Sequence, residues 1–107
     1  MDLEEFIRRT WTQHYHTTLM LADRLVAHAA LRGAPQTSHD GRLAREAAHR
    51  LAGSLGMYGL SEGSDVATSL EMHLAAPSDF PLSDDEFLAA AVRLRELIEA
   101  GPGPAED

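Results

Sequence analysis

The 107-residue chain contains no cysteine and no lysine, and each absence limits what the protein can do. Without cysteine, the chain can form no disulfide, no thiolate metal site and no thiol nucleophile. All nine basic residues are arginines, and 17 acidic residues give a formal net charge of -8. DNA and RNA binding needs clustered cations that neutralise phosphates, so this charge argues against a nucleic-acid partner.

Long apolar runs are also absent, and no stretch approaches the roughly 20 residues that cross a bilayer. An acidic run, Asp2, Glu4 and Glu5, stands where an export signal would carry basic residues. The chain has no glycine-rich nucleotide-binding motif, which argues against an ATP-using kinase. We therefore expect a single cytoplasmic domain that is monomeric, does not contact the membrane and is not an enzyme of the kinase type.

Hydrophobic residues recur at spacings of three and four along four segments, which predicts four helices. Short connections between amphipathic helices favour antiparallel neighbours. The sequence therefore predicts an all-α, up-down-up-down four-helix bundle over residues 1–100, with residues 101–107 as a flexible tail. The four helices are expected at about residues 2–31, 40–57, 60–74 and 83–100.

Local signals mark several ends of these helices. Asp40 is a suitable N-cap for the second helix, and Gly59 can end it in the left-handed conformation. Ser83, followed three residues later by Glu86, forms a capping-box pattern before the fourth helix. The apolar stripe of the first helix begins at Leu3, and Phe6 widens it.

His49 lies in the middle of the second predicted helix, and a helical wheel places it on the outward face. With Ala47 at the centre of the buried face, His49 lies roughly 200° away, at about 100° per residue. Residues 40–53 carry a local net charge of +1, whereas residues 84–107 carry -5. The other residues on the outward face are Arg42, Arg45, Ala52, Gly53 and Gly56.

This outward face is suited to covalent group transfer with another protein. Glycine costs roughly 1 kcal/mol relative to alanine inside a helix, but Gly53 and Gly56 let a partner surface approach the imidazole closely. The imidazole side chain has an ordinary pKa of about 6.5, so it is partly neutral and nucleophilic at neutral pH. A phosphoryl group on His49 would lie near Arg42 and Arg45, which could hold its charge.

The other histidines do not form a metal-binding pattern. His14 and His16 would point about 160° apart on a helix and cannot share one ion. His28 and His73 could meet across the bundle, but no Glu-x-x-His motif accompanies them. We therefore expect no metal site and no bound cofactor in this chain.

A motif that begins at the exposed histidine resembles the histidine-phosphotransfer (HPt) domain of multistep phosphorelays. The matching residues are the run His49-Arg50-Leu51-Ala52-Gly53-Ser54, then Gly59, then Leu70-Glu71. The family usually has lysine three residues after the histidine, where this chain has Ala52. It usually has an aliphatic residue where this chain has Gly63, and we expect that glycine to loosen the start of the third helix.

The resemblance implies that His49 accepts a phosphoryl group from the phospho-aspartate of a receiver domain and passes it to another receiver. The partner would belong to a response regulator or a hybrid histidine kinase, and its receiver domain would supply an acidic pocket and Mg²⁺. Either Arg45 provides the cation that the family's lysine usually supplies, or exchange is weakened. Two alternatives stay open: an HPt-like module that docks on a receiver or kinase without being phosphorylated, and a structural bundle with no such partner.

Overall fold

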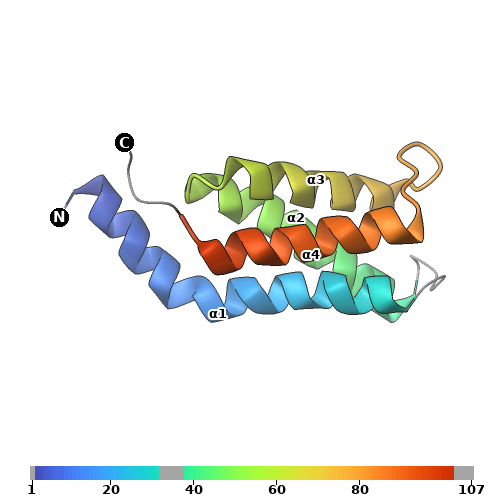
Figure 1. Cartoon of the computed structure of the whole chain (residues 1–107), viewed down its shortest axis with the longest axis horizontal. Coiled ribbons are helices and arrows are strands. Elements are labelled where there is room, and N and C mark those ends of the chain that lie inside the picture. Colours follow the sequence, from blue (N-terminus) through green and yellow to red (C-terminus); the bar gives the residue numbers. More distant parts are fainter. Residues whose placement is uncertain (1, 32–37, 103–107) are drawn as a thin grey trace.

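The described part of the chain forms four helices, and their order is the predicted one. The computed structural model describes residues 2–31 and 38–102, and it contains no strand in this part of the chain. The helices run alternately up and down, so that each is antiparallel to the next (Figure 1). This arrangement confirms the predicted all-α, up-down-up-down bundle. The four helices are α1 (Leu3–Ala30), α2 (His39–Met57), α3 (Ser61–Ala75) and α4 (Asp84–Ala100).

The core lies between helices that pack in a closed ring. Each helix packs against two neighbours, in the order α1, α2, α3, α4 and back to α1. The buried face of α2 is rich in alanine, with Ala44, Ala47 and Ala48 all buried, so neighbouring helices can approach it closely. The largest fully buried side chains are Leu25, Leu51, Leu55, Leu70, Leu94 and Ile98.

Side-chain caps fix the starts of α2 and α4. Ser83 accepts a hydrogen bond from the Glu86 backbone N–H at 3.0 Å, and the Glu86 carboxylate accepts one from the Ser83 N–H at 2.8 Å. This geometry confirms the predicted capping box. The N-cap of α2 is Ser38 rather than the predicted Asp40, because the Ser38 hydroxyl accepts from the Gly41 N–H at 3.0 Å. Asp40 lies in the first turn instead, where its charge favours the helix dipole.

Glycine explains both the end of α2 and the close approach of α3. Gly59 has a φ of 77°, and the Leu60 N–H reaches back to the Leu55 carbonyl at 3.0 Å, which confirms the predicted glycine C-cap. Gly63 is buried, and a Cβ added there would lie 3.0 Å from the Leu55 Cδ1. It therefore permits tight packing of α3 on α2, rather than the loosening expected from the sequence.

Helix α1 is continuous but longer than the bundle that it joins. Its 28 residues span about 42 Å at about 1.5 Å per residue, and its N-terminal part turns at an angle and extends past the ends of the other helices (Figure 1). The Thr18 hydroxyl donates to the His14 carbonyl at 2.8 Å, a type of bond that bends helices. Leu3 is 72% exposed and Phe6 is 56% exposed, so the apolar stripe of α1 continues beyond the core. We call residues 3–10 the α1 extension.

Trp11 lies where the α1 extension meets the bundle. Its ring packs edge-on against Tyr58, with ring centroids 5.0 Å apart, and against Tyr15 at 5.9 Å. Gly101, just after α4, lies so close that an added Cβ would be 3.1 Å from the Trp11 Nε1. The indole thus joins the first helix to the end of the last one. The predicted flexible tail falls mainly on residues 103–107, which lie outside the described residues.

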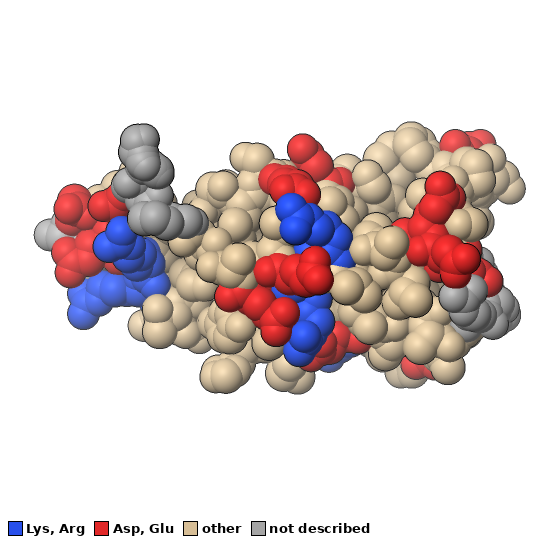
Figure 2. All heavy atoms as spheres, viewed as in Figure 1, with Lys and Arg blue, Asp and Glu red and all other residues tan. Residues whose placement is uncertain are grey.

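Ion pairs cross the surface of α4 to its two neighbours. Arg93 contacts Glu62 on α3 at 3.0 Å, and Arg95 contacts Asp23 on α1 at 2.6 Å. Figure 2 shows arginine and acidic side chains together across the middle of this face. Exposed pairs of this kind contribute about 0–1 kcal/mol each, so they add less to stability than the apolar core.

Two buried histidines, His28 and His73, both pack against Phe87. The ring of His28 is 5.8 Å from that of Phe87, and the ring of His73 is 5.7 Å from it. The His73 Nδ1 lies 2.8 Å from the Phe80 carbonyl, whereas the His28 Nδ1 has no hydrogen-bond partner among the described residues. No group of three or more histidine, aspartate or glutamate side chains in residues 2–31 and 38–102 could hold a metal ion.

The burial of His28 predicts a loss of stability in mild acid. Desolvation lowers the pKa of His28 below its ordinary value of 6.5, with a smaller raising effect from Asp40 and a further lowering effect from His73. A depressed folded-state pKa means that protons bind the unfolded chain more readily. The stabilising contribution is therefore complete above about pH 6.5 and is lost as the pH falls through the folded-state pKa.

We expect the free energy of unfolding in urea to decrease between about pH 7.5 and about pH 5.5, and to decrease less in His28→Gln. The exposed His14, on the same helix, offers a matched control, because His14→Gln should keep the wild-type pH dependence. An unchanged pH dependence in His28→Gln would show that another group controls acid stability.

Candidate functional site

His49 occupies the outward face of α2 and contacts one carboxylate from α3. Its side chain is 74% exposed, as the helical wheel placed it. The His49 Nδ1 lies 2.7 Å from the Glu71 Oε2, and the Glu71 side chain is 26% exposed. The contact joins residues 22 positions apart, and it exists because α2 and α3 pack side by side in antiparallel register.

The chemistry of this contact determines which ring nitrogen is reactive. An ionised carboxylate can only accept hydrogen bonds, so a contact of 2.7 Å requires the proton to be on the His49 Nδ1. In the neutral ring the other nitrogen, Nε2, then carries a free lone pair. Glu71 therefore holds the imidazole in the tautomer that has its nucleophilic nitrogen at Nε2.

An open hollow of about 430 Å³ surrounds the histidine, between α2 and α3. Arg45 and Arg42 line it, one and two turns before His49 on α2. Arg50, the next residue along the helix, lines a different hollow between α1 and α2. The structure therefore brings two of the nearby arginines to the histidine and turns the third away.

The small residues after His49 differ in their surroundings. Gly53 is exposed, and a Cβ added there would meet no atom within 4 Å. Gly56 is also exposed, with the Ser64 Oγ 3.7 Å from its added Cβ position. Ala52 is half-buried and packs against the core, and its carbonyl accepts a hydrogen bond from the Ser64 hydroxyl at 2.7 Å. Ala52 is thus less outward than the wheel placed it, because α3 covers part of this face.

Glu71 is a site residue whose own role is absent from the sequence-based prediction. Its place in the Leu70-Glu71 pair was the available signal, since that pair recurs at a fixed distance from the histidine in the motif. A helical wheel describes one helix at a time, so it cannot show that a side chain of α3 meets one of α2.

A four-helix bundle in which a carboxylate orients an exposed histidine and arginines flank it has the architecture of a phosphohistidine carrier. The comparison with known families agrees: the family model for the Hpt domain matches residues 17–100. The chain belongs to the HPt family. Proteins of this family carry phosphoryl groups on histidine in two-component phosphorelays, act as phosphocarriers rather than kinases, and interact with receiver domains and kinases.

No curated protein and no solved structure shows a significant match to the chain. Within the described ranges, 2–31 and 38–102, no helix combines the length and the apolar character that a membrane span requires.

Proposed function

We propose that His49 is the phosphorylated residue, which accepts a phosphoryl group from the phospho-aspartate of one receiver domain and passes it to the aspartate of another. The contact between the His49 Nδ1 and Glu71 carries this proposal, because it leaves Nε2 unprotonated on an exposed ring. Family membership supports the reaction class but does not identify the residue or the partners.

The transfer of the phosphoryl group needs no further reactant. The Nε2 lone pair attacks the phosphorus, the P–N bond forms, and the P–O bond to the receiver's aspartate breaks to leave a carboxylate. The ring becomes formally positive while Nδ1 keeps its proton, and the Glu71 carboxylate 2.7 Å away stabilises that charge. Passage to a second receiver reverses these steps.

Two groups of charges would support the phosphoryl group during transfer. Arg45 and Arg42 line the hollow around His49, where they can face the phosphoryl oxygens. The receiver supplies its acidic pocket and Mg²⁺, so this chain needs to hold no metal of its own. Catalysis then depends mainly on positioning and on stabilisation of the transferred charge.

The test is incubation of the protein with receiver domains that carry a labelled phospho-aspartate. Label that moves to the protein and is acid-labile but base-stable identifies phosphohistidine. Absence of such label with every candidate receiver would overturn the carrier proposal. The alternative, a docking module that is never phosphorylated, is favoured by Ala52, which leaves the family's usual cation position without charge. That module would bind receivers without gaining label.

We expect Glu71→Gln to slow phosphoryl transfer about tenfold. The amide is neutral, so the charge-assisted hydrogen bond to Nδ1 becomes an ordinary one and the positive ring is stabilised less. The transfer rate is measured by quenching, at defined times, the labelling reaction with a phosphorylated receiver. The tautomer of the His49 ring is measured by ¹⁵N NMR. The protonated-Nε2 form should become more populated.

Glu62→Gln is the matched control for this change, because Glu62 lies on the same helix but pairs with Arg93. It should transfer at the wild-type rate and keep the wild-type His49 tautomer. Equal rates in Glu71→Gln and the wild type would show that the Nδ1 contact does not contribute to transfer.

We expect Arg45→Ala to slow transfer by about three- to tenfold and Arg50→Ala to leave it nearly unchanged. The reason is placement, since Arg45 shares the hollow of His49 and Arg50 lines the one between α1 and α2. The rates are compared with the same phosphorylated receiver at equal concentrations. Equal or reversed effects would remove the argument that Arg45 compensates for the missing lysine.

A further inference from the structure

The α1 extension presents an apolar stripe that the rest of the described chain does not cover. Leu3 is 72% exposed and Phe6 is 56% exposed, and Ile7 next to them is half-buried. With Leu3 at 0° on a helical wheel, Phe6 lies about 60° to one side and Ile7 about 40° to the other. These side chains therefore form one continuous face, of the kind that helices bury against a partner.

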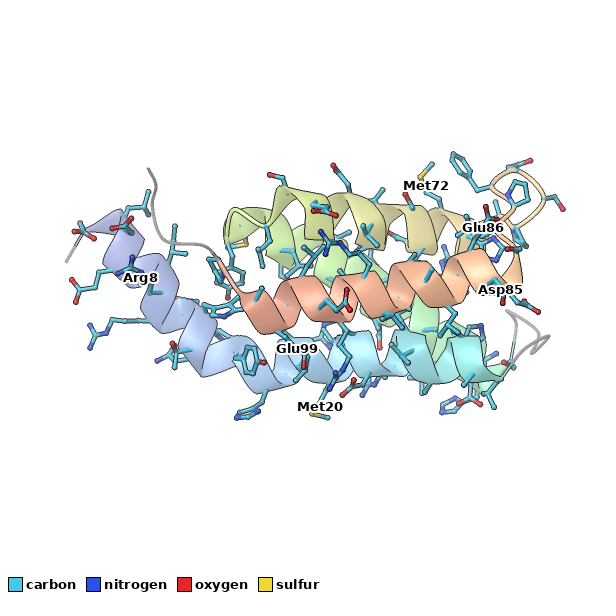
Figure 3. All side chains as sticks on the ribbon, in the orientation of Figure 1. Arg8, Met20, Met72, Asp85, Glu86 and Glu99 are labelled. Atoms are coloured by element: carbon cyan, nitrogen blue, oxygen red, sulfur yellow. The ribbon has the colours of Figure 1, made fainter. Side chains whose placement is uncertain are left out.

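Charged residues border this apolar face, and their order indicates which kind of partner surface is complementary to it. Glu4 and Arg8 lie on the same flank of the stripe, at about 100° and about 140° on the wheel, with the acid one turn before the base. Figure 2 shows acidic and arginine side chains together at this end of the molecule, and Figure 3 shows Arg8 on the extension, away from the other helices. When two such flanks lie antiparallel, the acidic residue of each faces the basic residue of the other.

We propose that two copies of this chain associate through their α1 extensions, packed antiparallel about a two-fold axis near Phe6. The axis places Phe6 against Phe6 of the partner subunit. It also places Glu4 beside Arg8 of the partner subunit, and Arg8 beside Glu4 of the partner subunit. A two-fold pair uses the same patch on both copies, so both ion pairs form at once.

The position of the extension supports a role separate from phosphotransfer. The family model matches residues 17–100, so residues 3–10 lie outside the matched part. His49 lies in the hollow between α2 and α3, whereas the extension continues α1 beyond the bundle. Pairing of two extensions would therefore leave both histidines accessible. Because each extension is short, the interface falls in the size class of weak and transient complexes.

Sedimentation equilibrium of the full chain at rising concentration, from about 10 µM to about 1 mM, tests this association. We expect the mean mass to rise from one chain toward two, and Phe6→Glu to remain monomeric throughout. Glu4→Arg and Arg8→Glu should each weaken association by about three- to tenfold, because each places like charges together twice. The double variant Glu4→Arg/Arg8→Glu should regain the wild-type affinity, because it only exchanges the two partners.

Three results would overturn the proposal. The first is a wild-type chain that stays monomeric over the whole range, and the second is a double charge exchange that fails to restore association. The third is association that appears only after residues 103–107 are removed, which would make the tail the group that covers the stripe. Circular dichroism and phosphoryl uptake should be unchanged in Phe6→Glu, since Phe6 belongs neither to the core nor to the His49 site.

Discussion

His49→Gln is expected to take up no phosphoryl group from any phosphorylated receiver domain. Glutamine has a similar size, but its amide nitrogen is not nucleophilic, so no P–N bond can form. Because the His49 side chain is 74% exposed, the free energy of unfolding should change by no more than about 0.5 kcal/mol. Transfer of label, measured beside urea unfolding of the same sample, separates loss of chemistry from loss of fold.

His39 provides the matched control, since it is another exposed histidine on α2. His39→Gln should accept label at the wild-type rate. Label that persists in His49→Gln would place the phosphorylation elsewhere. Loss of label in both variants would point to a general effect on α2 rather than to one nucleophile. Receiver binding by unlabelled His49→Gln, in contrast, is expected to continue, because the docking surface remains.

Gly53→Leu should make the protein more stable and at the same time less active. The backbone at Gly53 is helical and its added Cβ would meet no atom within 4 Å, so a better helix former should stabilise the fold by about 0.5–1 kcal/mol. Helical side chains point toward the N-terminus and cover the preceding turn, which here carries His49. Leucine would therefore occupy the space through which a receiver must approach, and transfer should fall at least about tenfold.

Urea unfolding and transfer from a phosphorylated receiver measure the two effects. Ala89→Leu, which adds a leucine at an exposed position of α4, is the control for a new apolar surface side chain. It should transfer normally. A Gly53→Leu protein that transfers at the wild-type rate would show that the glycine is not needed for close approach of the receiver. A Gly53→Leu protein that is less stable than the wild type would show that the space around residue 53 is not open.

Much of the fold is predictable because its determinants are local in the sequence. Apolar spacing alone indicates four helices, and the Ser83 and Glu86 pair identifies the start of α4 from residues three positions apart. Gly59 ends α2 through its own left-handed conformation, which the residue type already favours. The exposed side of α2 follows from the same periodicity, so the location of His49 on that side needs no knowledge of the other helices.

The features that the sequence could not provide depend on contacts between helices. The 2.7 Å contact of His49 with Glu71 requires the register of α2 against α3. Leu3 and Phe6 continue the apolar pattern of α1 without interruption, yet they lie beyond the bundle, because periodicity describes a face and not what covers it. From the sequence, Gly63 is expected to loosen α3, because its close contact with Leu55 depends on how α3 packs against α2.

The position of Trp11 gives the protein a built-in optical probe. It is the only tryptophan in the chain, and it lies between the α1 extension, Tyr58 and the end of α4 at Gly101. Its fluorescence emission should shift to longer wavelength if the last turn of α4 detaches or if the first helix separates from the bundle. Unfolding and fraying at the C-terminal end of the bundle can therefore be followed in the unlabelled protein, with no dye near His49.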